Sequence, residues 1–324
     1  MRRLACPHRW VSVLSLSILA VLLSVVFSLE APLAGEPLPR IPSRFLDSRG
    51  FPWMLSQRDD TEAPLWRTRH PLGDNLPEPI REAPLLGLVL PHHDVASPMT
   101  ARILSEVAAV LSKLSPEQQP EAIILIGPNH TRSGSARIQT FAGDWETPTG
   151  VFPVAQDWQD VLVRDFGAEG DPSLMAREHS LSYLVPWLHH TLPEASVLPV
   201  LIHGNLDRKG CERLAETLAG FMQARRTLIV ASVDFSHGLS PEDALAADET
   251  TWRHVQSGGV NNILRLDNRY LDAPPTLATM MLTMSVQQAE APYLAGHAEA
   301  SLFLGKPLTS TTSYLCMAYH DKQE

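Results

Sequence analysis

Short, almost purely apolar segments that alternate with stretches of helical length are the feature that most constrains the fold of this chain. The apolar segments lie at residues 85–90, 122–127, 196–202, 227–233 and 311–319. Strands are apolar along their whole length when helices cover both faces of a parallel sheet. The helical stretches lie at residues 97–111, 207–225 and 274–289 and from residue 240 onward. This alternation predicts an α/β fold with a central, mostly parallel sheet and helices on both faces.

The first 30 residues have the pattern of a membrane-targeting segment. Arg2, Arg3 and Arg9 precede an uncharged, mainly apolar run over residues 10–29. About 20 apolar residues can span a bilayer, and a basic flank favours the cytoplasmic side for the amino end. We therefore expect residues 1–30 to be a signal anchor or a signal peptide. The rest of the protein would then be extracytoplasmic, on the periplasmic side, either anchored to the membrane or exported.

The remaining sequence divides into a proline-rich tether and lead-in, residues 31–84, and a folded domain, residues 85–322. The formal net charge is −10, and no cluster of Lys and Arg is present, which argues against a nucleic-acid partner. Three cysteines lie far apart without a CxxC pair, so they predict neither a disulfide framework nor a cysteine-based zinc site.

Histidines and carboxylates follow the apolar segments at the points where strands are expected to end. The clusters are Pro-His-His-Asp at 91–94, Asn-His at 129–130, His-Gly-Asn at 203–205 and Asp-Phe-Ser-His at 234–237, with Glu-His-Ser at 178–180 as a fifth. Ligands bind beyond the carboxyl ends of the strands in open α/β sheets, so these side chains should converge on one edge. Imidazole combined with carboxylate suits iron, copper or zinc. The sequence therefore predicts a metal site or another polar site at this edge.

The order of these motifs resembles that of the Memo family, known in bacteria as AmmeMemoRadiSam system protein B. The succession is PH, GPNH, GDWETPTG, EHS and ASVDFSH, and the resemblance extends over about residues 85–320. It implies the fold of class III extradiol dioxygenases, with a metal-type pocket at the corresponding edge of the sheet. It also implies radical-SAM proteins as possible partners.

Carried over position by position, the resemblance implies a set of metal-site residues: His92, His130, His179, Asp234, Ser236 and His237. The chain departs from the family at two points. PHHDV replaces the usual PHAGY, which adds His93 and Asp94, and Ser236 stands where some members have a cysteine ligand. Serine is a much weaker ligand than cysteine, so Asp234, His237, His179 or Asp94 would have to supply the third ligand.

The resemblance favours a mononuclear site for iron or copper, with zinc as a third possibility, and redox or dioxygenase-related chemistry. His179 or His237 would act as general acid or base, and Asn129 would donate a hydrogen bond to a bound oxyanion. Three alternatives remain open at this point. They are a true extradiol dioxygenase acting on a catechol-like ring, a non-catalytic module that binds a peptide or a small molecule, and a zinc hydrolase.

Overall fold

The computed structural model describes residues 39–44, 55, 61 and 64–322. Residues from Pro39 onward belong to one structural unit. The predicted targeting segment, residues 1–30, lies outside the described residues, as does most of the chain before residue 64. Within the described part of the chain, no helix combines the length and the apolar character needed to cross a bilayer.

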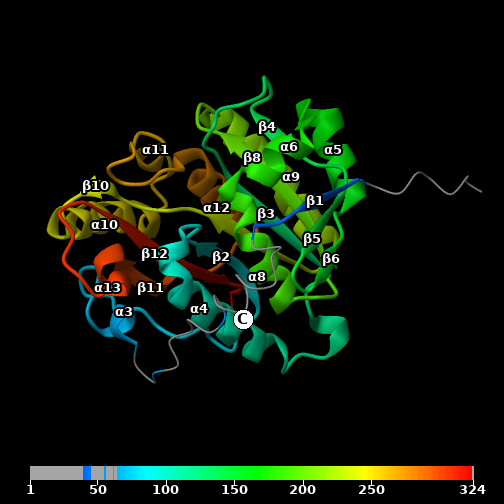
Figure 1. Cartoon of the computed structure of the whole chain (residues 1–324). Coiled ribbons are helices and arrows are strands. Elements are labelled where there is room, and N and C mark those ends of the chain that lie inside the picture. The colour runs from blue at the N-terminus through cyan, green and yellow to red at the C-terminus, as the bar shows by residue number, and fades with distance from the viewer. Residues whose placement is uncertain (1–38, 45–54, 56–60, 62–63, 323–324) are drawn as a thin grey trace, which may run out of the picture. The chain divides into compact units, whose positions relative to one another are not determined.

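A central sheet of nine strands dominates the described part of the chain (Figure 1). Eight strands lie in the order β10-β12-β2-β9-β3-β8-β4-β7, and β11 pairs with β12. In chain order the strands are β2 (Leu85–Leu90), β3 (Ala122–Asn129), β4 (Ile138–Thr140), β7 (Glu169–Gly170), β8 (Ser196–His203), β9 (Thr227–Ser232), β10 (His237–Leu239), β11 (Tyr293–Glu299) and β12 (Thr311–His320).

The four middle strands, β2, β9, β3 and β8, run parallel to one another. Leu90 pairs with Ser232 near the ends of β2 and β9, and Asn129 pairs with His203 at the ends of β3 and β8. The carboxyl ends of the four strands therefore share one edge of the sheet. The predicted α/β class with a central sheet is confirmed. The late strand β12 is antiparallel to β2. β11, which the pattern of apolar segments did not predict, is antiparallel to β12.

Alternate residues of each central strand point into two separate apolar cores, as in a sheet covered on both faces. Leu88 and Leu90 of β2 belong to one core, whereas Val89 belongs to the other. The first core is covered by α3 (Leu65–Thr68), α4 (Ser97–Leu111), α6 (Pro172–Arg177), α7 (His179–Ser182), α8 (Leu184–Thr191) and α13 (Ala300–Leu304). The second is covered by α5 (Gln156–Phe166), α9 (Arg208–Ala224), α10 (Pro241–Gln256), α11 (Val260–Ile263) and α12 (Pro274–Val286).

Three short strands form a second sheet in the order β1-β5-β6. They are β1 (Arg40–Pro42), β5 (Asp144–Thr147) and β6 (Gly150–Phe152). β1 pairs in parallel with β5, so this part of the proline-rich lead-in adds a strand to the folded domain. Trp145 of β5 is fully buried in the first core.

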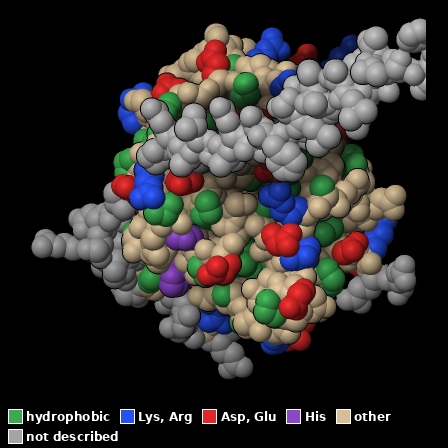
Figure 2. All heavy atoms as spheres, turned by 90° about the vertical axis from the view of Figure 1, so that its right-hand side faces the viewer, with side chains coloured by type: hydrophobic (Ala, Val, Ile, Leu, Met, Phe, Trp, Pro, Cys, Tyr) green, Lys and Arg blue, Asp and Glu red, His purple; other side chains and the backbone are tan. Residues whose placement is uncertain are grey.

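Charges of both signs are interspersed over the face of the molecule that Figure 2 shows. Lys and Arg side chains alternate there with Asp and Glu side chains, and the described residues in this view form no broad patch of one sign.

A buried ion pair joins the lead-in to the domain. Both terminal nitrogens of Arg67 in α3 donate to the carboxylate of Glu106 in α4, each at 2.7 Å. The same carboxylate accepts hydrogen bonds from Arg102 and from the backbone N–H of Ile80. Burial raises the pKa of Glu106, but the two arginines outweigh burial and hold the pKa below its ordinary value. Glu106 therefore contributes stability that is present above the ordinary glutamate pKa and is lost as the pH falls through the lower, folded-state pKa.

We expect Glu106→Gln to lower the free energy of unfolding by about 3 kcal/mol at neutral pH, because it leaves the buried Arg67 without its counter-charge. Urea unfolding at neutral and at acidic pH measures the effect. The difference from wild type should shrink in acid, where the wild-type carboxylate becomes protonated. Glu82→Gln is the matched control, since Glu82 pairs with Lys113 at an exposed site. Equal losses in the two variants would contradict this assignment.

Candidate metal centre

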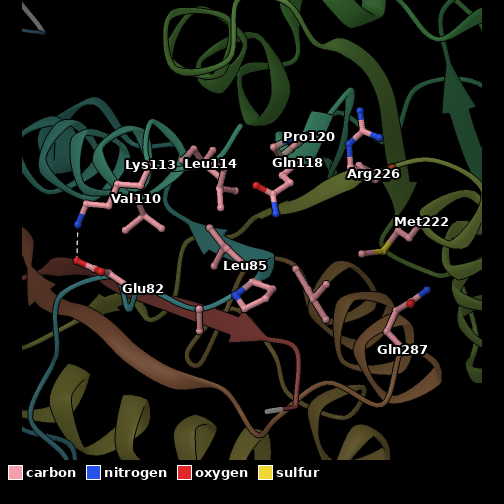
Figure 3. Close-up of a pocket in the computed structure, with 15 residues that line it drawn as sticks. Glu82, Leu85, Val110, Lys113, Leu114, Gln118, Pro120, Met222, Arg226 and Gln287 are labelled. Atoms are coloured by element: carbon pink, nitrogen blue, oxygen red, sulfur yellow. Dashed lines mark hydrogen bonds and ion pairs between the residues drawn. The ribbon is translucent and has the colours of Figure 1, made fainter. Parts of the chain in front are cut away.

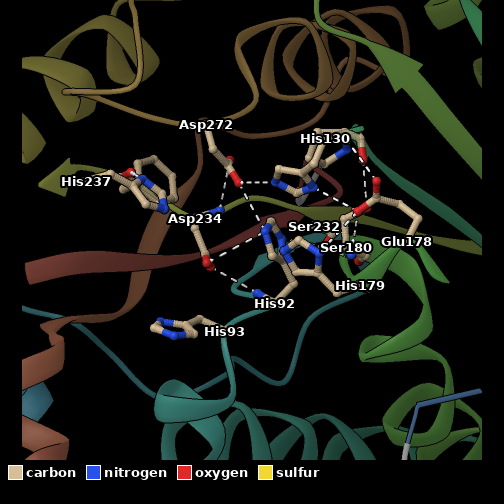
Figure 4. Close-up of polar contacts among 12 residues, drawn as sticks. His92, His93, His130, Glu178, His179, Ser180, Ser232, Asp234, His237 and Asp272 are labelled. Carbon is tan, nitrogen blue, oxygen red and sulfur yellow. Dashed lines mark hydrogen bonds and ion pairs between the residues drawn. The ribbon is translucent and has the colours of Figure 1, made fainter. Parts of the chain in front are cut away.

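Three imidazoles from separate segments of the chain meet at the edge where the central strands end (Figure 4). The ring centroid of His92 lies 5.0 Å from that of His130 and 5.1 Å from that of His179. The rings of His130 and His179 stack with their centroids 4.4 Å apart. Each residue offers one ring nitrogen, and these nitrogens all lie within 4.8 Å of one another. The predicted convergence of His92, His130 and His179 is thus present.

Backbone hydrogen bonds fix two of these histidines where their strands end. His92 follows β2, and its N–H donates to Asp234, which follows β9, at 3.0 Å. His130 follows β3, and its N–H donates to Glu178 at 2.9 Å. Each ligand candidate is therefore held by a carboxylate from another segment of the site.

A glycine in β3 lets α7, which begins with His179, lie against the sheet. A Cβ atom at Gly127 would come within 2.8 Å of the Leu181 side chain and 3.0 Å of the Ser180 hydroxyl. That hydroxyl donates to the carbonyl of Pro128 at 2.8 Å. The close contact between β3 and α7 places His179 beside His130.

A hydrogen bond at Nδ1 of His92 turns the other ring nitrogen, Nε2, toward the centre of the cluster. Nδ1 lies 3.0 Å from the Ser232 hydroxyl, and that hydroxyl donates its own hydrogen to the carbonyl of Ser180. Ser232 must therefore accept from Nδ1–H. In the neutral ring, Nε2 then carries the lone pair that a metal ligand requires.

Glu178 orients the ring of His130 in the same way, through a hydrogen bond at Nδ1. Its carboxylate lies 2.8 Å from Nδ1 of His130 and also accepts the N–H of Ser180. The glutamate side chain is fully buried, whereas that of His130 is 27% exposed. A carboxylate behind a histidine is the usual outer partner of a metal-bound imidazole, because it orients the ring and makes its other nitrogen more basic.

Two aspartates complete the cluster. Oδ2 of Asp272 lies 3.0 Å from Nε2 of His92 and 3.0 Å from Nε2 of His130. Oδ2 of Asp234 lies 3.7 Å from Nε2 of His92. The two acids are also bonded to each other's backbone, since each N–H donates to an oxygen of the other residue. His92, Asp234 and Asp272 form a second group with the spacing of metal ligands.

The electrostatics of the cluster favour a bound cation. Burial lowers the pKa of His92, but Asp234 and Asp272 outweigh burial and raise it. Burial also opposes the charge on His130, but Asp272 and Glu178 raise its pKa to about 10. Burial and the positive charges of His92 and His130 lower the pKa of His179 to about 4. The carboxylates thus stabilise positive charge between them, and His179 remains neutral with a lone pair available.

Some residues predicted for the site lie outside the cluster. The Ser236 hydroxyl is fully buried and bonds at 2.8 Å to Ser313, which donates to Asp248 at 2.6 Å. Asn129 donates to the side chain of Gln139 and to a backbone carbonyl, so its amide is engaged away from the metal-ligand groups.

His237 and Asp94 lie at the edge of the site. Nδ1 of His237 donates to the carbonyl of Phe235 at 2.6 Å, and His237 lines the cavity beside the cluster without joining either ligand group. Asp94 forms an ion pair with Arg44. His203, at the end of β8, accepts the backbone N–H of Asn205.

Asp272 belongs to the site without any signal in the sequence pattern, and Glu178 was predicted only as part of a polar motif. Asp272 precedes α12 instead of following a strand, so the rule that located the histidines could not find it. Its backbone bond to the carbonyl of Asp234 brings this loop to the edge of the sheet.

Two adjoining cavities open onto the cluster. One, of about 380 Å³, is lined by His92, His93, His130, His179, Asp234, His237, Asn268, Asp272 and Thr312. The other, of about 510 Å³, shares His130, Asn268 and Asp272 with the first. A third cavity, of about 460 Å³, lies at the opposite ends of the strands, where β2 and β9 begin, and is mostly apolar (Figure 3). None of its lining residues is a histidine, whereas five histidines line the first cavity.

Sequence comparison agrees with the motifs and the fold. The family model described as Memo-like protein matches residues 72–306, well over half of the chain. The chain belongs to the Memo-like family.

Individual relatives of this Memo-like chain are distant. A MEMO1 family protein of Methanopyrus kandleri is 26% identical over 237 residues, which covers 69% of this chain and 81% of the relative. A MEMO1 family protein of Thermotoga neapolitana is 30% identical over 184 residues, covering 55% and 61% respectively. The crystal structure of an uncharacterized protein from Escherichia coli K12 is similar with a TM-score of 0.47 and 14% identity, covering 72% of this chain and 99% of that one.

We expect Ser236→Ala to leave metal binding intact, because the Ser236 hydroxyl bonds to Ser313 and not to the cluster. The lost hydrogen bond should lower the free energy of unfolding by about 1–3 kcal/mol. Metal content of the purified protein and urea unfolding measure the two effects. Loss of metal from a folded Ser236→Ala protein would make Ser236 a ligand after all.

Proposed function

We propose that this Memo-like protein binds one Fe(II) through Nε2 of His92, Nε2 of His130 and a carboxylate oxygen of Asp272, and is an oxidoreductase. Ligand atoms about 2.1 Å from a metal and at right angles to each other lie about 3 Å apart. The distance from Asp272 Oδ2 to each of the two ring nitrogens is 3.0 Å. This spacing, together with the Nδ1 hydrogen bonds that turn both Nε2 atoms toward Asp272, is the observation that carries the proposal.

The ligand types favour iron over copper. Soft thiolates select Cu(I), whereas two histidines and one carboxylate with open positions are typical of non-haem Fe(II) oxygenases. This chain has Ser236 where some relatives have a cysteine, and the buried Cys316 is not part of either ligand group. Asp234 and Asp272 add two negative charges, which suit a divalent ion.

Fe(II) in such a site supplies redox chemistry, including the activation of O₂. Glu178 and Ser232 hold the rings of His130 and His92 in the tautomer that binds metal. His179 is neutral and 43% exposed, so it can accept a proton from a substrate hydroxyl at the mouth of the site.

The cavity favours a small, polar substrate over a catechol ring. Its volume is about 380 Å³, and its described lining residues include no phenylalanine, tyrosine or tryptophan. An aromatic substrate would need an apolar wall. Five histidines and two aspartates instead suit a substrate rich in oxygen atoms.

The metal content of the full-length protein, purified without chelator, tests the proposal. We expect one iron per chain in wild type, and strong loss in His92→Ala and Asp272→Asn. Glu178→Gln should weaken metal affinity about 10–100-fold, because Glu178 orients His130 without being a ligand. His203→Ala is the matched control, since His203 also ends a central strand but lies outside the cluster.

The alternatives give different results. Stoichiometric zinc with ester or amide hydrolysis would support a hydrolase, and a metal-free protein that binds small ligands would support a binding module. Rapid O₂ consumption with catechols would support the true dioxygenase. The first two outcomes contradict the proposed iron site, and the third contradicts a small, polar substrate.

We also propose that residues 1–30 deliver the domain to the extracytoplasmic side of the membrane, on the basis of the apolar run and its arginine flank. We expect the full-length chain to sediment with membranes, or to be found cleaved in the periplasm. Protease added to bacterial spheroplasts should degrade the domain. A full-length chain that such protease cannot reach would contradict this localisation. The radical-SAM partnership stays a prediction.

A further inference from the structure

His93 is a second histidine after β2, and its side chain lies apart from the cluster that contains His92. Figure 4 shows His93 to the left of His92, on the same side of the cluster as His237. His93 and His237 line the 380 Å³ cavity, together with Thr312. His93 thus faces the space next to the proposed metal without belonging to either group of candidate ligands.

The hydrogen bond between His93 and Tyr314 has a defined direction. Nδ1 of His93 lies 2.6 Å from the hydroxyl oxygen of Tyr314, whose residue is completely buried. A buried hydroxyl hydrogen needs an acceptor, and within the described part of the chain the structure gives this hydroxyl the ring nitrogen as its partner. Burial and the charge of Asp234 raise the pKa of Tyr314, so the phenol keeps its proton and donates.

This direction fixes the opposite tautomer from that of the neighbouring histidines. A neutral imidazole carries one hydrogen, so a ring that accepts at Nδ1 carries the hydrogen at Nε2. His92 and His130 each donate from Nδ1, and Nε2 of each faces Oδ2 of Asp272. His237 also donates from Nδ1, to the carbonyl of Phe235. His93 therefore differs from these three imidazoles in accepting at Nδ1, which leaves its hydrogen at Nε2.

We propose that His93, oriented by Tyr314, donates a hydrogen bond from Nε2–H to an oxyanion of the bound substrate, and that the substrate is a small carboxylic acid. This inference rests on the proposed metal. Without a cation, Asp234 and Asp272 would repel a carboxylate. With a divalent ion between them, one carboxylate oxygen can face the metal while the other accepts from His93. Tyr314 is a positioning residue, and His93 is a binding residue.

The ring tautomer is measured directly by ¹⁵N NMR of the histidine side chains, in the metal-free protein and in the protein loaded with Zn²⁺. We expect a pyridine-type Nδ1 and a pyrrole-type Nε2 for His93 in wild type. Tyr314→Phe should abolish this preference. Tyr319→Phe is the matched control, because Tyr319 lies on the same strand and its buried hydroxyl has no hydrogen-bond partner among the described residues.

Acetate binding to the Co²⁺-loaded full-length protein, followed by the visible spectrum, tests the role of the donor. We expect His93→Phe to weaken acetate binding about tenfold, because a hydrogen bond to a charged acceptor is lost. His93→Gln retains an N–H donor and should recover part of the affinity. Tyr314→Phe should weaken binding less than His93→Phe does, and Tyr319→Phe should have no effect. Cobalt content should stay the same in all four variants.

Two results would overturn the inference: a pyrrole-type Nδ1 on His93 in wild type, or unchanged acetate affinity in a His93→Phe protein that still holds cobalt. Failure of the proposed function would instead be seen in the metal content of the wild-type protein. In that case wild type itself binds no metal, whatever residue stands at position 93. The tautomer measured in the metal-free protein then decides whether His93 is a donor.

Discussion

The Asp272 carboxylate, placed between two imidazole nitrogens, is the interaction on which the site depends. One of its oxygens lies 3.0 Å from Nε2 of His92 and 3.0 Å from Nε2 of His130. Two ring nitrogens that point inward and two nearby acids form a prearranged space in which positive charge is favoured. A divalent cation would satisfy all of these groups together, and removal of any one would leave the others poorly compensated.

The sheet brings these groups together through its strand order. β2, β9, β3 and β8 are parallel and adjacent, so the segments that follow β2, β9 and β3 begin at one edge. His92, Asp234 and His130 come from those three segments. This arrangement allowed much of the fold and most of the histidine cluster to be predicted from apolar runs followed by polar motifs, since both follow from local pattern and strand direction.

The remaining features depend on contacts that local pattern does not encode. Asp272 reaches the cluster through a loop that is bonded to the Asp234 backbone, and nothing in its own segment marks it as a ligand. Ser236 occupies a motif position associated with metal, yet its hydroxyl bonds to Ser313 because β12 lies beside it. The antiparallel strand β11 carries His297 and Glu299 within an otherwise apolar run, and this mixture concealed it.

The loop that carries Asp272 differs in kind from the segments that carry His92 and His130, which directly follow central strands. It joins α11 to α12 on the surface of the domain and contributes no residue to the sheet itself. Loops tolerate substitution and changes of length far better than central strands do. A family built on this plan could therefore exchange one ligand for another, and one metal for another, by altering a few loop residues while the histidine framework stayed as it is.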